Sequence, residues 1–249
     1  MSVSTHYYYL LVNLGCLLVP FVFSFHPRIR FDRQWKAFFP GVLAMMLLFI
    51  PWDILFTASG VWGFNEKYTT GIFIGNLPLE EWLFFICIPY ACLFTYHCIS
   101  RFTEGKKLSA AFDFLPAVII AWCLLAAVAF HDRQYTFLSH LLCALLLLLH
   151  RLLLKSTYIG RFMLTFIILL LPFIISNGIL TGVSFWNYPL VNTDPDGIAE
   201  KIVWYNNMEN LQLRIFSMPL DDISYGLTML LLVTTVYEWR KGREIGRVR

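Results

Sequence analysis

Charged residues are scarce in this sequence: they make up 14% of its 249 residues, whereas a soluble domain carries about 25%. Hydrophobic residues make up 58%, and the mean hydropathy is +0.65. This apolar surplus is too large for a water-soluble core and indicates a membrane protein. The net charge of +3 lies in short segments between apolar runs. That distribution is typical of membrane topology and excludes a nucleic-acid-binding groove.

The sequence also lacks the cysteine patterns of redox and metal sites. Its six cysteines all lie in apolar stretches, and no two of them form a CxxC pair or a metal-ligand spacing. We therefore interpret them as small residues of a helical core and expect neither disulfides nor metal sites there.

Long apolar runs are abundant, and seven of them have about the 20 residues that a helix needs to cross a bilayer. The first run has no Lys or Arg before it and no small-residue cleavage site after it, so we expect a membrane helix and not a cleaved signal peptide. The sequence predicts an all-α integral membrane protein with seven transmembrane helices, near residues 7–25, 37–58, 78–100, 114–131, 135–154, 161–184 and 219–239.

Basic residues are divided unequally between the two sides that these spans define. One side receives 15 Lys and Arg residues, and the other receives four: Lys67, Arg133, Lys201 and Arg214. The basic side is expected in the cytoplasm, which places the N-terminus outside and the C-terminus in the cytoplasm of a multi-pass inner-membrane protein. We expect the basic tail, residues 240–249, to anchor on anionic lipid.

Two segments of the chain resemble each other. Residues 76–81 read NLPLEE at the start of the third span, and residues 217–222 read SMPLDD at the start of the seventh. Before these motifs, Asp53 and Trp62 correspond to Asn177 and Trp186. The sequence therefore predicts a 3+1+3 repeat, in which a three-helix unit with the PLEE motif (1–113) and one with the PLDD motif (135–249) flank a linking helix (114–134).

Because a single helix links the two repeats, both are expected to cross the membrane in the same direction. They are then related by a rotation axis along the membrane normal. Both acid pairs are then expected at one depth near the outer surface, about 5 Å into their helices at about 1.5 Å per residue. Asp53 and Asn177 approach the same layer from the ends of their own spans. The sequence thus predicts five carboxylates in one layer: Asp53, Glu80, Glu81, Asp221 and Asp222.

These acids have an ordinary interpretation as helix-start residues that complement the helix dipole. The two copies at matched depth favour a functional role, and so does Asp53, because an ionisable group inside an apolar span is costly. Neighbouring acids lie about 100° apart around a helix, so one member of each pair is expected to face the bundle interior. Carboxylates packed in an apolar site cannot all ionise, and we expect an acid–base site acting on an apolar substrate.

Aromatic residues are concentrated near this layer. Anchoring at the membrane interface is their ordinary role, and stabilisation of a carbocation by ring faces is the alternative. Trp62 and Trp186 are the best candidates for the second role because they recur in both halves. The predicted substrate-binding residues are Trp62, Trp186, Phe84, Phe85, Asn177 and Tyr225.

The stretch from Asp53 to Trp62 with the 78–81 motif, followed later by the 219–222 motif, resembles the membrane lycopene cyclases of the heterodimeric bacterial type in their fused, single-chain form. In that family, two three-span subunits or one fused chain each carry a Pro-x-Glu-Glu/Asp type motif. The resemblance extends over nearly the whole chain and is most specific over residues 77–94. Asp221 stands where Glu is commoner, so the two sites need not be equivalent.

The resemblance implies cyclisation of lycopene ends to β-ionone rings, through γ-carotene to β-carotene, as a non-redox isomerisation. A carboxylic acid protonates carbon 2, the neighbouring double bond attacks the cation at carbon 1, and a base removes the proton from carbon 6. The resemblance implies that the acid and the base are supplied by Glu80, Glu81, Asp221 and Asp222, and that Asp53 adjusts their acidity. Which residue is the acid and which is the base stays open. The implied partners are lycopene, other apolar carotenoids, the lipid bilayer and other membrane enzymes of the carotenoid pathway.

The G-x-G-x-x-G fingerprint of dinucleotide sites does not follow any predicted strand. Its absence separates this chain from the flavin-binding lycopene cyclases of soluble fold. We expect no organic cofactor and no metal, although carboxylates alone leave Mg²⁺ open.

A proton-coupled membrane transporter that uses the same buried carboxylates is the main alternative. The acids, however, lie at helix starts and not at mid-membrane breaks. A retinal-binding seven-span receptor would need a Lys in its last span, and residues 219–239 contain none. A membrane prenyltransferase would need spaced acids with cationic partners, which these adjacent acids lack.

Overall fold

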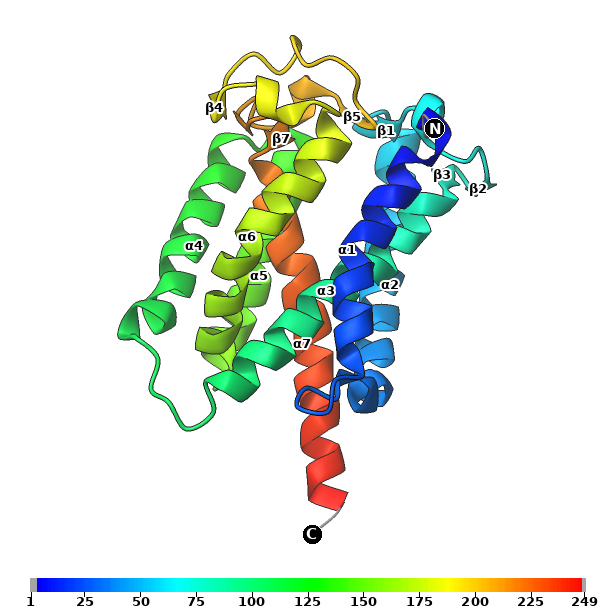
Figure 1. Cartoon of the computed structure of the whole chain (residues 1–249). Helices are drawn as coiled ribbons and strands as arrows, with labels where there is room; N and C mark the ends of the chain where they lie inside the picture. The colour runs from blue at the N-terminus through cyan, green and yellow to red at the C-terminus, as the bar shows by residue number, and fades with distance from the viewer. Residues whose placement is uncertain (1–3, 248–249) are drawn as a thin grey trace.

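The computed structural model describes the backbone of residues 4–247 and the side chains of residues 4–242. Within this part of the chain, seven long helices form a bundle (Figure 1). They are α1 (Tyr8–Ser24), α2 (Trp35–Ala58), α3 (Leu79–Phe102), α4 (Ala110–Ala129), α5 (Gln134–Leu148), α6 (Ile159–Thr181) and α7 (Asp221–Arg247). A π-helical turn, Leu149–Leu154, extends α5. The helices agree with the predicted spans within a few residues, except that α7 continues well beyond residue 239.

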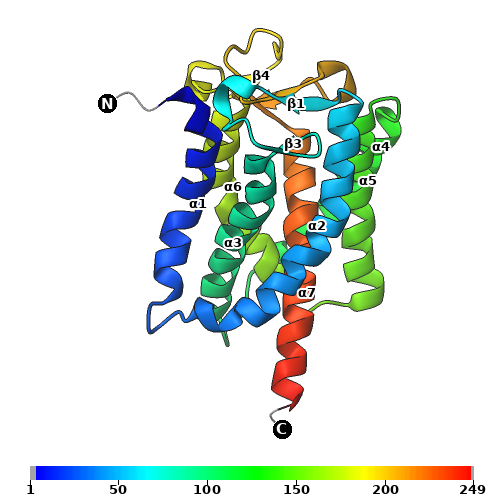
Figure 2. The same ribbon diagram turned by 90° about the vertical axis from the view of Figure 1, so that its right-hand side faces the viewer.

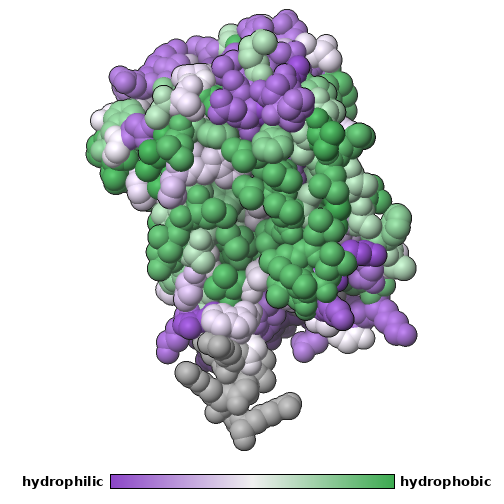
Figure 3. All heavy atoms as spheres, turned by 180° about the vertical axis from the view of Figure 1, so that it is seen from behind, coloured by the Kyte–Doolittle hydropathy of each residue, from purple (hydrophilic) through white to green (hydrophobic). Residues whose placement is uncertain are grey.

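Six segments of the described chain are long and apolar enough to cross a membrane, and together they contain α1 to α6. Large apolar side chains such as Leu47, Val128 and Leu153 are exposed on the outside of the bundle, as expected where lipid is the solvent. Figure 3 shows the result as a hydrophobic band between hydrophilic ends. The chain is therefore a multi-pass membrane protein.

The seventh helix, α7, is not among these six segments. Two acids in its first turn and the basic residues after position 239 lower its apolar content. It nevertheless runs lengthwise through the bundle beside the other helices, and its C-terminal part extends beyond their ends (Figures 1 and 2). The basic tail predicted as a lipid anchor lies mostly outside the residues whose side chains are described.

Short strands cover one end of the bundle (Figure 1). Strand β1 (Trp62–Phe64) in the α2–α3 loop pairs antiparallel with β5 (Val203–Tyr205) in the α6–α7 loop. A hairpin of β2 (Phe73–Ile74) and β3 (Leu77–Pro78) leads into α3. A hairpin of β6 (Arg214–Ile215) and β7 (Met218–Pro219) leads into α7, with β4 (Val191–Asn192) at its edge.

The two hairpins give the two motifs the same local structure. Phe73 pairs with Pro78, and Arg214 pairs with Pro219. After each proline, the next backbone N–H donates back across the hairpin: Leu79 to Ile72 O at 2.8 Å, and Leu220 to Leu213 O at 2.9 Å. Both helices then start with their acid pair in the first turn.

The strands and the basic loops lie at opposite ends of the bundle. The connections after α1, α3 and α5, which carry basic residues, lie at the end where α7 finishes (Figure 1). The acid pairs lie at the strand end, where α3 and α7 begin. Which end faces the cytoplasm stays a prediction from the charge distribution.

Candidate active site

A small cavity of about 50 Å³ lies at the strand end of the bundle. Among the described residues, three carboxylates line it: Asp53 from α2, Glu81 from α3 and Asp222 from α7. All three are buried. The rest of the polar lining consists of Asn177 and four tyrosines, Tyr9, Tyr135, Tyr205 and Tyr225.

Asp53 and Glu81 are two of these three carboxylates. Strand β1 follows α2 after a short turn and brings Trp62 back over the helix, so that its indole N–H donates to Asp53 Oδ1 at 2.5 Å. The Thr57 hydroxyl, one helical turn away, lies 3.5 Å from the same oxygen. The Tyr9 hydroxyl of α1 donates to Glu81, and Glu81 lines the same cavity as Asp53, close enough for their charges to interact.

Asp222 has a different environment, made of hydrogen-bond donors only. The Tyr135 hydroxyl donates to its Oδ1 at 2.5 Å, and the Asn177 amide donates to its Oδ2 at 2.6 Å. The Tyr205 hydroxyl lies 3.2 Å from the same Oδ2. Because several donors converge on one carboxylate, this arrangement stabilises its negative charge.

Tyr205 belongs to the loop that covers the cavity, outside the helices. Burial raises the pKa of its hydroxyl, and the nearby charge of Asp222 adds to this effect. The phenol is therefore kept in its protonated, donating form. The buried Arg214 guanidinium lies 5.7 Å from the Tyr205 ring and is held by the Ser217 carbonyl at 2.6 Å and by Asn207 Oδ1 at 2.7 Å.

The first acid of each pair points away from the cavity and binds loop backbone. Glu80 Oε1 accepts the backbone N–H of Thr70 at 2.7 Å, and Asp221 Oδ2 accepts that of Leu211 at 3.1 Å. Each partner lies ten residues before its acid. This division within each pair agrees with the predicted 100° offset, and it assigns Glu80 and Asp221 to the positioning of the loops.

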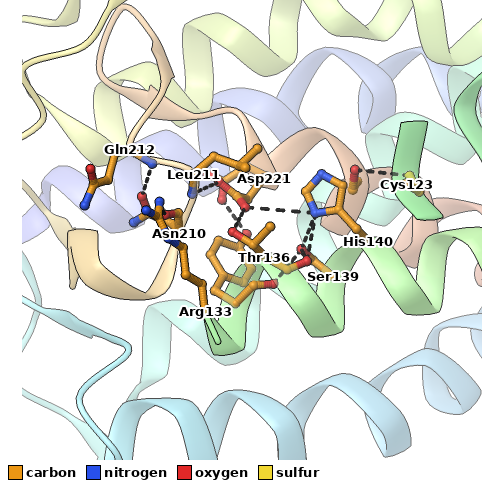
Figure 4. A network of polar contacts seen from close by, with 12 residues as sticks. Cys123, Arg133, Thr136, Ser139, His140, Asn210, Leu211, Gln212 and Asp221 are labelled. Atoms are coloured by element: carbon orange, nitrogen blue, oxygen red, sulfur yellow. Dashed lines mark hydrogen bonds and ion pairs between the residues drawn. The ribbon is translucent and has the colours of Figure 1, made fainter. Parts of the chain in front are cut away.

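Figure 4 shows the surroundings of Asp221. Its Oδ1 accepts the Thr136 hydroxyl at 2.6 Å and lies 4.0 Å from the His140 ring. Beside it, Asn210 receives hydrogen bonds from Arg133 and from the Gln212 backbone and thereby shapes the loop that ends at Leu211. Asp221 therefore connects this loop to α5.

Some of the predicted aromatic residues reach the cavity. Trp62, Phe84 and Tyr225 line it, and the Trp62 ring meets the Tyr135 ring edge to face at 5.1 Å. Phe85 is buried behind the lining, against Phe84 and Phe49.

Trp186 lies apart from Trp62 and does not line this cavity. Its side chain is 63% exposed and lies away from the three carboxylates. The residue paired with Trp62 is Tyr205, in the register of β1 and β5. The reason is the longer second loop, which leaves Trp186 in a short helical turn, Phe185–Asn187, directly after α6, and returns to the cavity only at β5.

The sequence-based prediction missed Tyr9, Tyr135 and Tyr205. Tyr9 and Tyr135 occupy matching positions, because each lies near the start of the second helix before its motif helix and each donates to the second acid of that motif. Tyr205 carries no such signal, since only the long-range pairing of β5 brings it to the cavity.

The fold and the cavity together define a class: a multi-pass membrane protein that brings carboxyl groups and aromatic rings from several helices into one buried space. The family model for lycopene cyclase matches residues 6–99 and 132–240, which is most of the chain. The chain therefore belongs to the lycopene cyclase family, as the motifs predicted, and it is an enzyme of carotenoid cyclisation. A comparison with curated proteins found no match, and neither did a comparison with solved structures.

Proposed function

We propose that this chain is a lycopene β-cyclase that converts lycopene through γ-carotene to β-carotene, one end at a time. One observation carries the proposal: Asp53, Glu81 and Asp222 converge from three helices on one cavity lined by aromatic rings. The reaction needs an acid, a base and a dry cavity, and these residues supply all three.

The Asp53–Glu81 pair acts as the acid. Two interacting carboxyl groups in an apolar cavity cannot both carry a charge, so the pair retains one proton. That proton is transferred to carbon 2 of the terminal double bond and leaves a tertiary cation at carbon 1. The electrons of the 5,6 double bond then form the bond between carbons 1 and 6, which moves the cation to carbon 5.

Asp222 acts as the base. Its donors, Tyr135, Asn177 and Tyr205, hold it in the ionised form before the reaction. It removes the proton from carbon 6, and the electron pair of that bond forms the 5,6 double bond of the β ring. One proton enters and one leaves, so product and substrate are isomers. The faces of Trp62, Phe84 and Tyr225 stabilise the intermediate cations.

Glu80 and Asp221 are positioning residues in this scheme, because they hold the loops that carry Thr70 and Leu211 over the cavity. The 3+1+3 repeat is part of the proposal. It is supported by the two matched segments, which leave out residues 100–131 with α4, and by the equivalent hairpins before α3 and α7.

The proposal is tested by pigment analysis. The chain is expressed in a bacterium that accumulates lycopene, and the extracted carotenoids are separated by chromatography. We expect γ- and β-carotene from the natural chain and lycopene alone from Glu81→Gln at equal protein level in the membrane. Lycopene alone from the natural chain would refute a cyclase, and an ε ring in the product would refute the role given to Asp222.

A further inference from the structure

A second, larger hollow opens on the side of the bundle, between α1, α3 and α6. Its volume is about 730 Å³, and its lining is almost entirely apolar. The lining includes Gly15 and Cys16 of α1, Ala91 and Cys92 of α3, and Ile175 of α6. We call this hollow the side groove. Because it lies between membrane-spanning segments, it opens to the lipid in which carotenoids dissolve.

The acid cavity alone is too small for the substrate. Its volume is about 50 Å³, whereas an apolar cavity of about 150 Å³ is needed to bind benzene. A six-membered ring with methyl groups is larger still. The cavity must therefore open toward a neighbouring space when a carotenoid end enters it.

Phe173 lies at the junction of the two spaces, because it lines both the acid cavity and the side groove. Its half-buried ring reaches from α6 to α7, where it lies 3.4 Å from the position of a Cβ atom at Gly226. Pro172, beside it, removes a backbone hydrogen bond of α6. A rotation of this one ring would join the two spaces.

Other parts of the bundle are closed by direct packing. Between α2 and α7, for example, a Cβ atom at Gly41 would lie 2.8 Å from the Val233 carbonyl. At the strand end, Tyr8 and Trp186 line the side groove. The exposed Trp186 thus lies on the path to the site without being part of it.

Building on the proposed function, we propose that the side groove holds the linear polyene chain of the carotenoid while one end passes Phe173 into the acid cavity. Three observations specify this occupant: the apolar lining, the opening to lipid and the continuity with the three carboxylates through one side chain. Only one end reaches the acids at a time, so γ-carotene must leave and turn round before its second end is cyclised.

The proposal is tested by filling the groove. Gly15→Trp places a large ring there, and no atom within the described part of the chain lies within 4 Å of a Cβ at this position. Leu18→Trp is the matched control, since Leu18 is 62% exposed on the same helix and does not line the groove. Both changes are made in full-length Glu81→Gln protein, which is expected to bind lycopene without converting it.

Binding is measured in nanodiscs from the visible absorption of lycopene that stays with the purified protein. We expect Gly15→Trp to weaken binding at least tenfold and Leu18→Trp to leave it unchanged. Equal binding by the two variants would overturn the side groove as the substrate site. If the Glu81→Gln parent itself binds no lycopene, the proposed function fails, and the groove proposal fails with it.

The passage at Phe173 has its own test. Phe173→Trp enlarges the ring at the junction. We expect lycopene binding in the Glu81→Gln background to stay within about twofold, and turnover in the otherwise natural chain to fall at least tenfold. Loss of binding and turnover together, or unchanged turnover, would contradict the role of this ring as the gate.

Discussion

Neighbouring acids in each motif contact different parts of the protein. Glu81 and Asp222 line the cavity, whereas Glu80 and Asp221 accept backbone N–H groups of the loops above it. A helix turns by about 100° per residue, so two adjacent acids can serve both the reaction and the loop that covers it. This geometry explains why a pair of acids, and not a single one, begins each helix.

The first prediction compares the two acids of the PLEE motif. Glu81→Gln is expected to slow cyclisation at least 100-fold, because general acid catalysis contributes about 10²–10⁴-fold. Glu80→Gln is expected to stay within about tenfold of the natural chain, since its amide oxygen can still accept the Thr70 N–H. Initial rates in isolated membranes measure both. Equal losses would mean that Glu80 also takes part in proton transfer.

The second prediction concerns the donors around Asp222. Tyr205→Phe removes one hydrogen bond to this carboxylate, and a bond to a charged group is worth about 1.5–3 kcal/mol. We expect cyclisation to slow by about tenfold or more. Tyr225→Phe is the control, because it keeps a ring at the cavity and removes a hydroxyl that does not bond to Asp222. A comparable loss in both variants would contradict a specific role for the Tyr205 hydroxyl.

At the scale of elements, the pairing of β1 with β5 joins the two loops over the cavity. Trp62 and Tyr205 are paired residues in this ladder, and both donate to carboxylates of the site. Gly63 lies opposite Trp204, whose ring occupies the space that a side chain at position 63 would need. The packing of β1 against β5 over the cavity therefore requires a glycine at position 63.

The third prediction tests this contact. Gly63→Ala is expected to destabilise the protein by about 1–3 kcal/mol, because the added methyl group overpacks against the Trp204 ring. Adding Trp204→Ala should restore part of this loss, since the two residues are in direct contact. Thermal unfolding of the detergent-purified single and double variants measures the coupling. Additive losses would contradict the direct contact between positions 63 and 204.

The sequence predicts the helices far better than the loops, for a physical reason. A membrane helix needs about 20 apolar residues in a row, and this signal is local. The strands have two or three residues each, and their register depends on contacts such as Trp62 with Tyr205, which are far apart in the chain. The motifs therefore indicated the acids, whereas no local signal indicated Tyr205 or the separation of Trp186 from Trp62.

At the scale of the whole molecule, the acid cavity lies among residues near the strand end of the bundle, and the basic loops lie at the opposite end (Figure 1). If the basic end is cytoplasmic, the acids lie near the outer surface of the membrane. The proposed side groove opens to the lipid between α1, α3 and α6, so entry through it would not depend on this orientation. The proposed chemistry of the site therefore does not depend on which end of the bundle faces the cytoplasm.

The fourth prediction tests the orientation. Met208→Cys is exposed at the strand end, and Lys106→Cys is exposed at the basic end. A membrane-impermeant thiol reagent should label Met208→Cys in intact cells and Lys106→Cys only after the membrane is opened. The unsubstituted chain gives the background from the natural cysteines. The reverse labelling pattern would place the acid cavity near the cytoplasmic surface.

In the proposed mechanism, buried carboxyl groups alone cyclise lycopene. The most direct measurement supplies lycopene to the purified chain in lipid vesicles, with a metal chelator present and without flavin or nucleotide. We predict that γ-carotene forms first and β-carotene follows, and that Asp222→Asn is at least 100-fold slower. A requirement for added metal or flavin, or an unchanged rate in Asp222→Asn, would contradict this account.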